Sequence, residues 1–321
     1  MKKIIVFGAS GDTGKYFVDY FISNNKEYKI IAVGTRKTDW FEKYGVDYIQ
    51  VDITEENEFD KLPQDNIYAV VDFAGLMPAR MEGYHPAKYI DVNIKGTVNI
   101  LEYSRKVKAD RILYMQSFGD IKDYGEEKLI LTTDLPRNFK YNTDHSVYVI
   151  SKNAAVDIIQ TYHEMFNLKS FIFRLPSIYL WSKEDHFYVD GVKRKIGYRI
   201  LIDNAIQGKT LEIWGDPKRK KDMIYVKDFC QMVYKALFVD KNKGYYNVGT
   251  GIGITLEDQI KGISKVFGNN KSEIVYCPEK NNAPQYIMDI TPAFIDLDYR
   301  PNYDYIKMLE DMKKEMELNR F

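Results

Sequence analysis

The sequence predicts an α/β fold with a doubly wound parallel sheet, followed by a smaller C-terminal domain of mixed structure. Over residues 1–175, short apolar runs alternate with segments of helix length, as expected when helices join neighbouring strands. The runs are nearly continuous in Ile, Val, Phe and Tyr, which is typical of parallel strands buried on both faces. We expect strands at 3–7, 29–33, 48–51, 69–73, 112–115 and 170–173.

The segments between these strands carry helical patterns. In 87–106, apolar residues recur at steps of three and four, which predicts one amphipathic helix. Further helices are expected at 15–22 and 148–166. The apolar stripe of the helix expected over 87–106 consists of Ile90, Ile94, Val98 and Leu101.

The C-terminal half has a less regular pattern. We expect 1–175 to form a first domain and 176–321 to form mainly a substrate-binding domain, with 222–250 returning to the first domain. One apolar helix is expected near 197–207. A charge-rich helix at about 303–318 is expected to lie on the surface.

Composition narrows the classes of partner and compartment. Lys plus Arg equals Asp plus Glu at 46 each, so nothing favours nucleic acid or an anionic membrane surface. No apolar stretch reaches the roughly 18 residues that span a bilayer. Two distant cysteines, Cys230 and Cys277, fit a reducing cytoplasm rather than a disulfide framework. The four histidines and two cysteines are scattered, so no metal site is expected.

A glycine-rich turn, GASGDTG at 8–14, follows the first expected strand and leads into a helix. Gly8 permits the tight turn, Gly11 lets the backbone approach a pyrophosphate, and Gly14 lets helix and strand pack closely. The helix N-terminus adds free N–H groups and partial positive charge. In this context the pattern predicts a Rossmann-type domain that binds a nicotinamide dinucleotide.

The end of the second strand indicates which dinucleotide. NAD-binding versions usually place Asp or Glu there to hold the ribose 2′-hydroxyl, whereas this chain has Arg36 and Lys37. An arginine suits a 2′-phosphate through charge and paired hydrogen bonds. The sequence therefore favours NADP(H), with NAD(H) as the alternative. The competing interpretation is a solvated basic loop.

Tyr148 and Lys152 form a Y-x-x-x-K pattern whose spacing places both side chains on one helix face. With the glycine turn, this resembles the short-chain dehydrogenase/reductase family, most closely its extended branch of NAD-dependent epimerase/dehydratase proteins, which act largely on nucleotide sugars. Other segments match the family in order and spacing. They are Asn93, Gly96, Thr97 and Asn99 in N-x-x-G-T-x-N, Ser117 at the catalytic Ser/Thr position, Arg174 to Ser177 for R-x-x-N, and 215–228 and 246–249.

The resemblance implies a catalytic set of Tyr148, Lys152 and Ser117, and elementary chemistry supports these roles. A free tyrosine has a pKa of about 10, so a neighbouring ammonium and the positive nicotinamide would have to lower it. Tyr148 would then exchange a proton with a substrate hydroxyl during hydride transfer, while Ser117 hydrogen-bonds the same oxygen. The alternative is a chance pair, because the chain has 26 tyrosines.

The resemblance also assigns binding residues. The expected substrate contacts are Ser117, Tyr148, Ser177 and Lys221. The last two replace the family's Asn and Arg. A lysine cannot form the planar, bidentate hydrogen bonds of an arginine. The expected cofactor contacts are Gly8, Ser10, Gly11, Asp12, Thr13, Gly14, Arg36, Lys37, Asp52, Ile53, Ala74, Gly75, Asn93, Lys152 and Pro176.

The reaction is narrowed by departures from the family. Dehydratases carry Asp-Glu after the catalytic residue, whereas Phe118 and Gly119 follow Ser117 here, which disfavours elimination. A 4-epimerase and a 4-keto reductase of a nucleotide sugar both remain open. A reductase of a non-nucleotide ketone or aldehyde and a non-catalytic NADP-binding sensor are further alternatives. The family dimerises through helices that match 87–106 and 148–166, so a homodimer is expected unless both stripes simply pack on the sheet.

Overall fold

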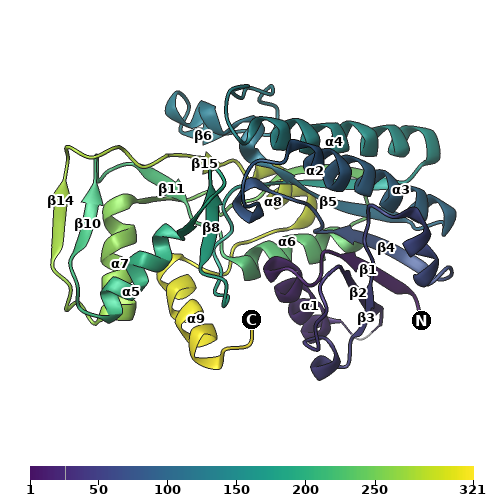
Figure 1. Cartoon of the computed structure of the whole chain (residues 1–321), viewed down its shortest axis with the longest axis horizontal. Helices are drawn as coiled ribbons and strands as arrows, with labels where there is room; N and C mark the ends of the chain where they lie inside the picture. The colour runs from purple at the N-terminus through teal and green to yellow at the C-terminus, as the bar shows by residue number, and fades with distance from the viewer. Residues whose placement is uncertain (26) are drawn as a thin grey trace.

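The computed structural model describes residues 1–25 and 27–321, and its centre is a parallel sheet. Seven strands of the described chain form this sheet in the order β12-β7-β5-β4-β1-β2-β3, which confirms the expected α/β class (Figure 1). Six of the strands had been expected, with ends that shift by up to two residues. The strands are β1 Lys3–Phe7, β2 Lys29–Gly34, β3 Asp47–Gln50, β4 Ile67–Asp72, β5 Arg111–Ser117, β7 Lys169–Leu175 and β12 Lys243–Asn247.

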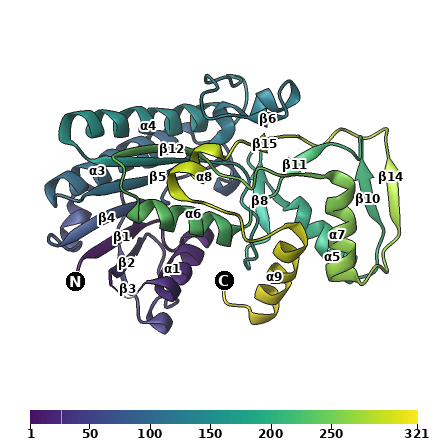
Figure 2. The same ribbon diagram turned by 180° about the vertical axis from the view of Figure 1, so that it is seen from behind.

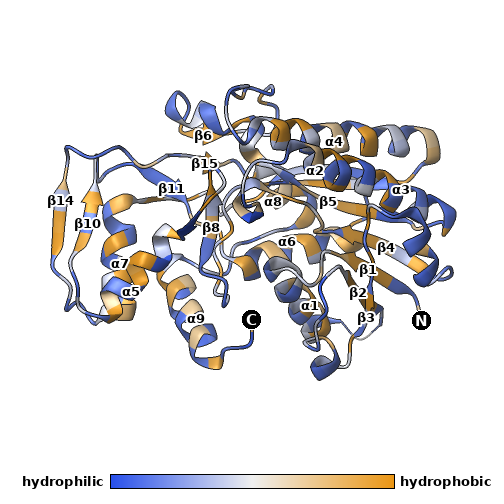
Figure 3. Ribbon diagram, in the orientation of Figure 1, coloured by the Kyte–Doolittle hydropathy of each residue, from blue (hydrophilic) through white to orange (hydrophobic). Residues whose placement is uncertain are grey.

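Helices cover both faces of the sheet (Figures 1 and 2). The helices α1, Asp12–Asn24, and α6, Val226–Phe238, lie on one face, and α3, Gly96–Lys106, and α4, Ser146–Phe166, lie on the other. Strand side chains alternate between the two resulting cores; Ile4 and Val6 of β1 join one, while Ile5 and Phe7 join the other. Figure 3 shows the apolar residues concentrated on these strands.

The prediction of a single amphipathic helix over 87–106 is wrong in detail. The segment consists of a short helix α2, Pro86–Tyr89, a π-helical turn, Ile90–Lys95, and then α3. The wider turn rotates the side chains out of a simple 3.6-residue register. As a result, Ile90 is 42% exposed, whereas the polar Asn93 is buried.

The C-terminal half combines small sheets with helices and lies at one end of the central sheet (Figure 1). The expected surface helix, α9 at Tyr305–Leu318, is only partly exposed, because Met308, Leu309 and Met312 pack into the core on its inner face. None of the described helices is long and apolar enough to cross a membrane. The remaining helices are α5 Gly197–Ile206, α7 Leu256–Gly268 and α8 Thr291–Leu297.

The strands outside the central sheet pair in twos. A parallel pair and an antiparallel pair shape the outer C-terminal half, a hairpin projects beside it, and a short parallel pair ties residues near 130 to residues near 287. These pairs bring distant parts of the chain to the carboxyl edge of the main sheet. They are β10 Leu211–Trp214 with β14 Ile274–Cys277, β11 Lys220–Asp222 with β13 Gly253–Thr255, β8 His186–Val189 with β9 Val192–Lys195, and β6 Ile130–Leu131 with β15 Ile287–Met288.

Candidate active site

The glycine turn lies where the carboxyl ends of β1 and β4 meet the start of α1. Gly8 has a φ of +70°, and a Cβ there would lie 2.5 Å from the backbone nitrogen of Ala74. A Cβ at Gly14 would lie 2.5 Å from the carbonyl oxygen of Gly8. Both glycines are therefore required by close packing, and the turn is held against the Ala74–Gly75 loop. Such a crevice at the carboxyl ends of parallel strands is where α/β proteins bind ligands.

The N-terminus of α1 remains suited to bind an anion. Its N-cap residue, Gly11, provides no side-chain cap, so the first N–H groups of the helix are left for a ligand. Asp12 in the first turn forms an ion pair with Arg80, with 2.9 Å between Oδ2 and Nη2. Arg80 follows β4 in a segment without a recognisable pattern, so sequence reasoning missed it. Ser10 is buried beneath the turn, and Thr13 is partly buried in α1.

Cations from three segments gather near the start of α1. Arg36 and Lys37 are exposed after β2, as expected. Burial lowers the pKa of Lys15, and the positive charges of Arg36 and Lys183 lower it further, whereas Asp12 opposes the shift. Lys15 and Lys183 were missed by sequence analysis. Lys15 directly follows the glycine turn and could have been noticed, but no local pattern marks Lys183.

Two of the expected cofactor contacts, Asp52 and Ile53, follow the end of β3. Asp52 is exposed and accepts hydrogen bonds from the N–H (2.9 Å) and the hydroxyl (2.8 Å) of Thr54. Ile53 is buried, and its carbonyl oxygen accepts a hydrogen bond from Asn99 at 2.8 Å. The second asparagine of the N-x-x-G-T-x-N segment therefore holds this loop in place.

The three proposed catalytic side chains come from two adjoining elements. Ser117 ends β5, and Tyr148 and Lys152 lie on the first turns of α4. Burial raises the pKa of Tyr148, while a hydrogen bond with the Ser117 hydroxyl opposes that rise. The Ser117 hydroxyl also accepts the N–H of Gly119 at 3.1 Å. The structure thus brings the two hydroxyl groups together at the sheet edge.

Lys152 is only 5% exposed, and its surroundings include a residue that sequence analysis missed. Its Nζ lies 4.1 Å from the centroid of the Tyr114 ring on β5. Asp72, which ends β4 and is 1% exposed, is the carboxylate that acts on it. Burial lowers the pKa of Lys152, and the Asp72 charge opposes this. A carboxylate that ends an otherwise apolar strand was a signal that could have been noticed.

Asn93 is buried in the π-helical turn and anchors the loop after β4. Its Oδ1 accepts the N–H of Leu76 at 2.8 Å, and its Nδ2 donates to the Leu76 carbonyl and to the Ser151 hydroxyl, both at 2.9 Å. The side-chain amide of Asn93 is therefore hydrogen-bonded to other groups of the protein. Asn93 also lies close to Gly75, where a Cβ would lie 3.3 Å from Asn93 Oδ1 and 3.5 Å from Lys152 Nζ.

The predicted substrate contacts lie where the C-terminal half meets the sheet. Pro176 is buried and Ser177 is exposed just beyond β7. The Nζ of Lys221 lies 5.5 Å from the ring centroid of Tyr179 and 5.7 Å from that of Tyr286. Burial alone would lower the pKa of Lys221, but the two tyrosine oxygens raise it above its ordinary value. Both tyrosines were missed, because nothing in the sequence connects position 286 with position 221.

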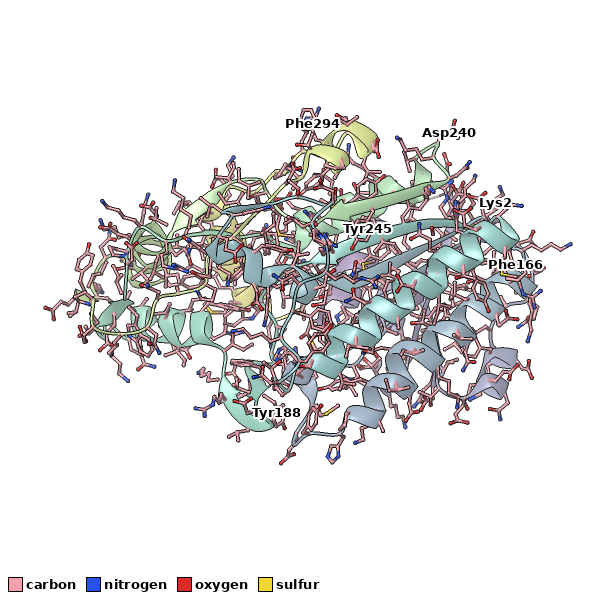
Figure 4. The ribbon with its side chains drawn as sticks, turned by 90° about the horizontal axis from the view of Figure 1, so that it is seen from above. Lys2, Phe166, Tyr188, Asp240, Tyr245 and Phe294 are labelled. Carbon is pink, nitrogen blue, oxygen red and sulfur yellow. The ribbon has the colours of Figure 1, made fainter. Side chains whose placement is uncertain are left out.

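A buried polar network lies behind Ser117. Asp120 is fully buried, and Arg174 donates a hydrogen bond to its Oδ2 at 3.1 Å. Gln116 accepts the hydroxyl of Tyr245 at 2.5 Å, and the guanidinium of Arg174 lies 4.7 Å from the Tyr245 ring centroid. Tyr245, labelled in Figure 4, lies on β12 and is half-buried. These contacts occupy Asp120, the first carboxylate after Ser117, and fix the end of β5.

The sequence profile of the NAD dependent epimerase/dehydratase family matches residues 4–249. The chain belongs to this family. A putative UDP-glucose 4-epimerase from Methanocaldococcus jannaschii is 25% identical over 94% of this chain and 94% of its own length. Two solved structures are similar at 21% identity over 98% of this chain and 99% of theirs. They are UDP-glucose 4-epimerase from Thermotoga maritima with UDP-glucose (TM-score 0.78) and UDP-glucuronic acid 4-epimerase from Bacillus cereus with NAD (TM-score 0.73).

Membership of the epimerase/dehydratase family confirms the resemblance inferred from Tyr148, Lys152 and the glycine turn. The chain is accordingly an NAD(P)-dependent enzyme of the extended short-chain dehydrogenase type. A nicotinamide dinucleotide is supported as cofactor, and the similar structures include complexes with NAD.

Proposed function

We propose that this protein is a 4-epimerase of a nucleotide sugar. The observation that carries the proposal is the meeting of Ser117, Tyr148 and Lys152 at the sheet edge, beside the glycine turn. The relative described as a putative UDP-glucose 4-epimerase and the two similar structures of UDP-sugar 4-epimerases support the choice of reaction.

In the proposed reaction, Tyr148 takes the proton of the C4 hydroxyl and later returns it. Ser117 donates a hydrogen bond to the same oxygen as it becomes a carbonyl, and Lys152 stabilises the phenolate form of Tyr148. The nicotinamide supplies the hydride acceptor and donor when the cofactor is bound. The uncapped start of α1 and the closely packed Gly8 and Gly14 fit such a cofactor.

Water elimination finds no support in the residues near Ser117. Phe118 and Gly119 occupy the positions where the resemblance places an acid and a base for dehydration. Asp120, the nearest carboxylate that follows, is fully buried and bound to Arg174. Hydride transfer without elimination is therefore the chemistry that these side chains support.

For the substrate, we propose a nucleoside diphosphate held by Lys221 and Ser177. The Lys221 ammonium stays charged between two tyrosines, and the exposed Ser177 interacts with one of them, Tyr286. A charged donor of this kind suits a phosphate oxygen. Tyr286 and Tyr179 supply the aromatic surface at the same position.

A 4-keto reductase that uses NADP(H) is the second candidate, and a specific observation favours it. Lys15, Arg36 and Lys183 lie close enough for their charges to interact near the start of α1. Such a cation group fits a 2′-phosphate. Titration with NADPH and NADH tests the preference; at least tenfold tighter binding of NADH would contradict the NADP assignment.

We also propose a homodimer formed through α3 and α4. Three large apolar side chains of α4, Ile150, Met165 and Phe166, are exposed by 40%, 66% and 44% (Phe166 is labelled in Figure 4). Sedimentation at micromolar concentration tests this, and a monomer would contradict it. Both free cysteines, Cys230 and Cys277, are buried, which fits our proposal of a cytoplasmic protein.

The reaction is tested by incubating the purified protein with UDP-glucose, UDP-N-acetylglucosamine or UDP-glucuronate and following the C4 proton by NMR. We expect the 4-epimer of at least one sugar to appear with catalytic amounts of NAD or NADP. Stoichiometric oxidation of NADPH with a 4-keto sugar would instead establish the reductase. If none of the substrates reacts under either condition, the proposed function is wrong.

A further inference from the structure

Asp72 is a buried carboxylate whose contacts do not account for its charge. It is 1% exposed at the end of β4. Its Oδ1 accepts the N–H of Ala74 at 2.9 Å, whereas its Oδ2 is buried with no hydrogen-bond partner in the described part of the chain. A buried ionised carboxylate is costly unless a counter-charge stabilises it. A nearby positive charge would therefore stabilise the ionised form of Asp72.

The strand register shows where the carboxylate lies. Asp72 pairs with Tyr114 across the β4–β5 ladder, so both side chains emerge on the same face of the sheet. That face is covered by α4, and the Lys152 Nζ lies 4.1 Å from the centroid of the Tyr114 ring. Asp72 and Lys152 thus share Tyr114 as a neighbour in a space with almost no solvent access.

The Lys152 ammonium likewise lacks a close polar partner among the described residues. It is 5% exposed, and within residues 1–25 and 27–321 its ammonium has no ion pair within 4 Å and no hydrogen bond. The titratable groups near it are Asp72 from β4 and Tyr114 from β5, and Tyr148, one turn earlier on α4, lies close to Tyr114. Burial together with the Asp72 charge raises the pKa of Tyr114, which keeps that ring neutral. Asp72 is the carboxyl of this group; burial raises its pKa, and the positive charge of Lys152 opposes that rise and favours the ionised form.

We propose that Asp72 is a positioning residue that keeps the Lys152 ammonium charged and in place beneath Tyr148. The inference rests on the proposed function, because it assigns Asp72 a role in the proton transfer at Tyr148. Without the carboxylate, a desolvated ammonium would lose its proton more readily. A neutral Lys152 could no longer stabilise the Tyr148 phenolate, so proton transfer would weaken although all three catalytic side chains remained.

Asp72→Asn tests this with almost no change in shape. The tyrosinate absorbance of each protein, minus that of the same protein carrying Tyr148→Phe, reports the ionisation of Tyr148 with saturating NAD⁺ bound. We expect Asp72→Asn to raise the pKa of Tyr148 by about one unit or more. An unchanged or lower pKa would overturn the proposal, since a carboxylate that acted directly on Tyr148 would produce a decrease when removed.

Asp228→Asn is the matched control. Asp228 is likewise fully buried, but it lies on α6, on the opposite face of the sheet, and accepts the N–H groups of Asn302 and Tyr303. We expect it to leave the ionisation of Tyr148 unchanged. A shift of similar size in this control would mean that loss of any buried carboxylate suffices, and would overturn the specific role of Asp72.

A second measurement needs no variant at Asp72. NMR of ¹³C-labelled lysine, with the Lys152 signal assigned by Lys152→Met, reports the charge of the ammonium in the intact protein. We expect Lys152 to be protonated at neutral pH, and a neutral Lys152 would overturn the proposal. Neither measurement requires a sugar, so their result is separate from the epimerase assay: a shift without turnover would leave Asp72 in place and remove only the proposed function.

Discussion

Two lysines, the buried Lys152 and the partly buried Lys221, lie in different halves of the candidate site, and their surroundings differ. Lys152 lies between the central sheet and α4, where burial lowers its pKa and the Asp72 carboxylate opposes that change. Lys221 lies among the short strands of the C-terminal half, where Tyr179 and Tyr286 raise its pKa above the ordinary value. The first ammonium can respond to charge that develops in a reaction. The second remains charged throughout and is suited to hold a phosphate.

The difference follows from how each region is built. Around Lys152, regular strands and a long helix bring close neighbours together in fixed register. Around Lys221, the three-residue strand β11 pairs with β13, and a single bridge to Tyr286 completes the surroundings. Changes near Lys152 should therefore alter the chemical step, and changes near Lys221 should alter substrate binding.

The largest effect is expected from Tyr148→Phe, on the Lys152 side of the comparison. Loss of the hydroxyl removes the general base of the proposed reaction, so kcat should fall by about 100-fold or more. Cofactor affinity should stay within about threefold, because no cofactor contact is assigned to that hydroxyl. Steady-state kinetics and a cofactor titration check both points. Turnover that persists near the original rate would remove Tyr148 from the mechanism.

Lys221→Met tests the role of Lys221 in substrate binding. The substitution keeps much of the side-chain volume but removes the charge, so KM should rise by about tenfold or more, with kcat nearly constant. Lys221→Arg is the matched control and should retain most of the affinity because the charge remains. The comparison between the two regions would fail if Lys221→Met lowered kcat while KM stayed constant.

Asp228 is a buried carboxyl away from both lysines, and its effect on the free energy of unfolding can be tested by changing the pH. Burial raises its pKa to about 6, so the folded state binds a proton that the unfolded state releases near pH 4. Its stabilising contribution is thus present below the unfolded pKa and is lost as pH rises through about 6. Relative to Asp228→Asn, the parent protein should gain about 1 kcal/mol in free energy of unfolding between pH 7 and pH 5. Urea denaturation at both values measures this, and a parent that loses stability instead would contradict it.

The smallest effect is expected from Tyr286→Phe. It keeps the ring beside Lys221 but removes one oxygen that supports the ammonium, so KM should rise by about two- to fivefold. Tyr124→Phe, in the same small cluster of residues, is the control and should leave KM unchanged. If Tyr286→Phe matches Lys221→Met in effect, the hydroxyl contacts substrate directly and the lysine is not the main phosphate contact.

Local patterns were sufficient for much of this molecule. The buried strands, the glycine turn and the Tyr148–Lys152 spacing all depend on residues near one another in the chain, and the first six strands of the sheet were expected from them. The π-helical turn at Ile90–Lys95 was not, because a one-residue widening leaves no trace in an otherwise helical pattern. Its effect is large, since it buries Asn93 and exposes Ile90.

The sequence by itself determined the fold class and the family, and it predicted the reacting side chains, because each depends on short-range spacing and on the chemistry of a residue type. Only the tertiary structure decided what surrounds each lysine. It set Asp72 of β4 against Lys152 of α4, and it brought Tyr286 to Lys221 across more than sixty residues. Burial and counter-charge depend on segments distant in the chain, and these set how each lysine behaves.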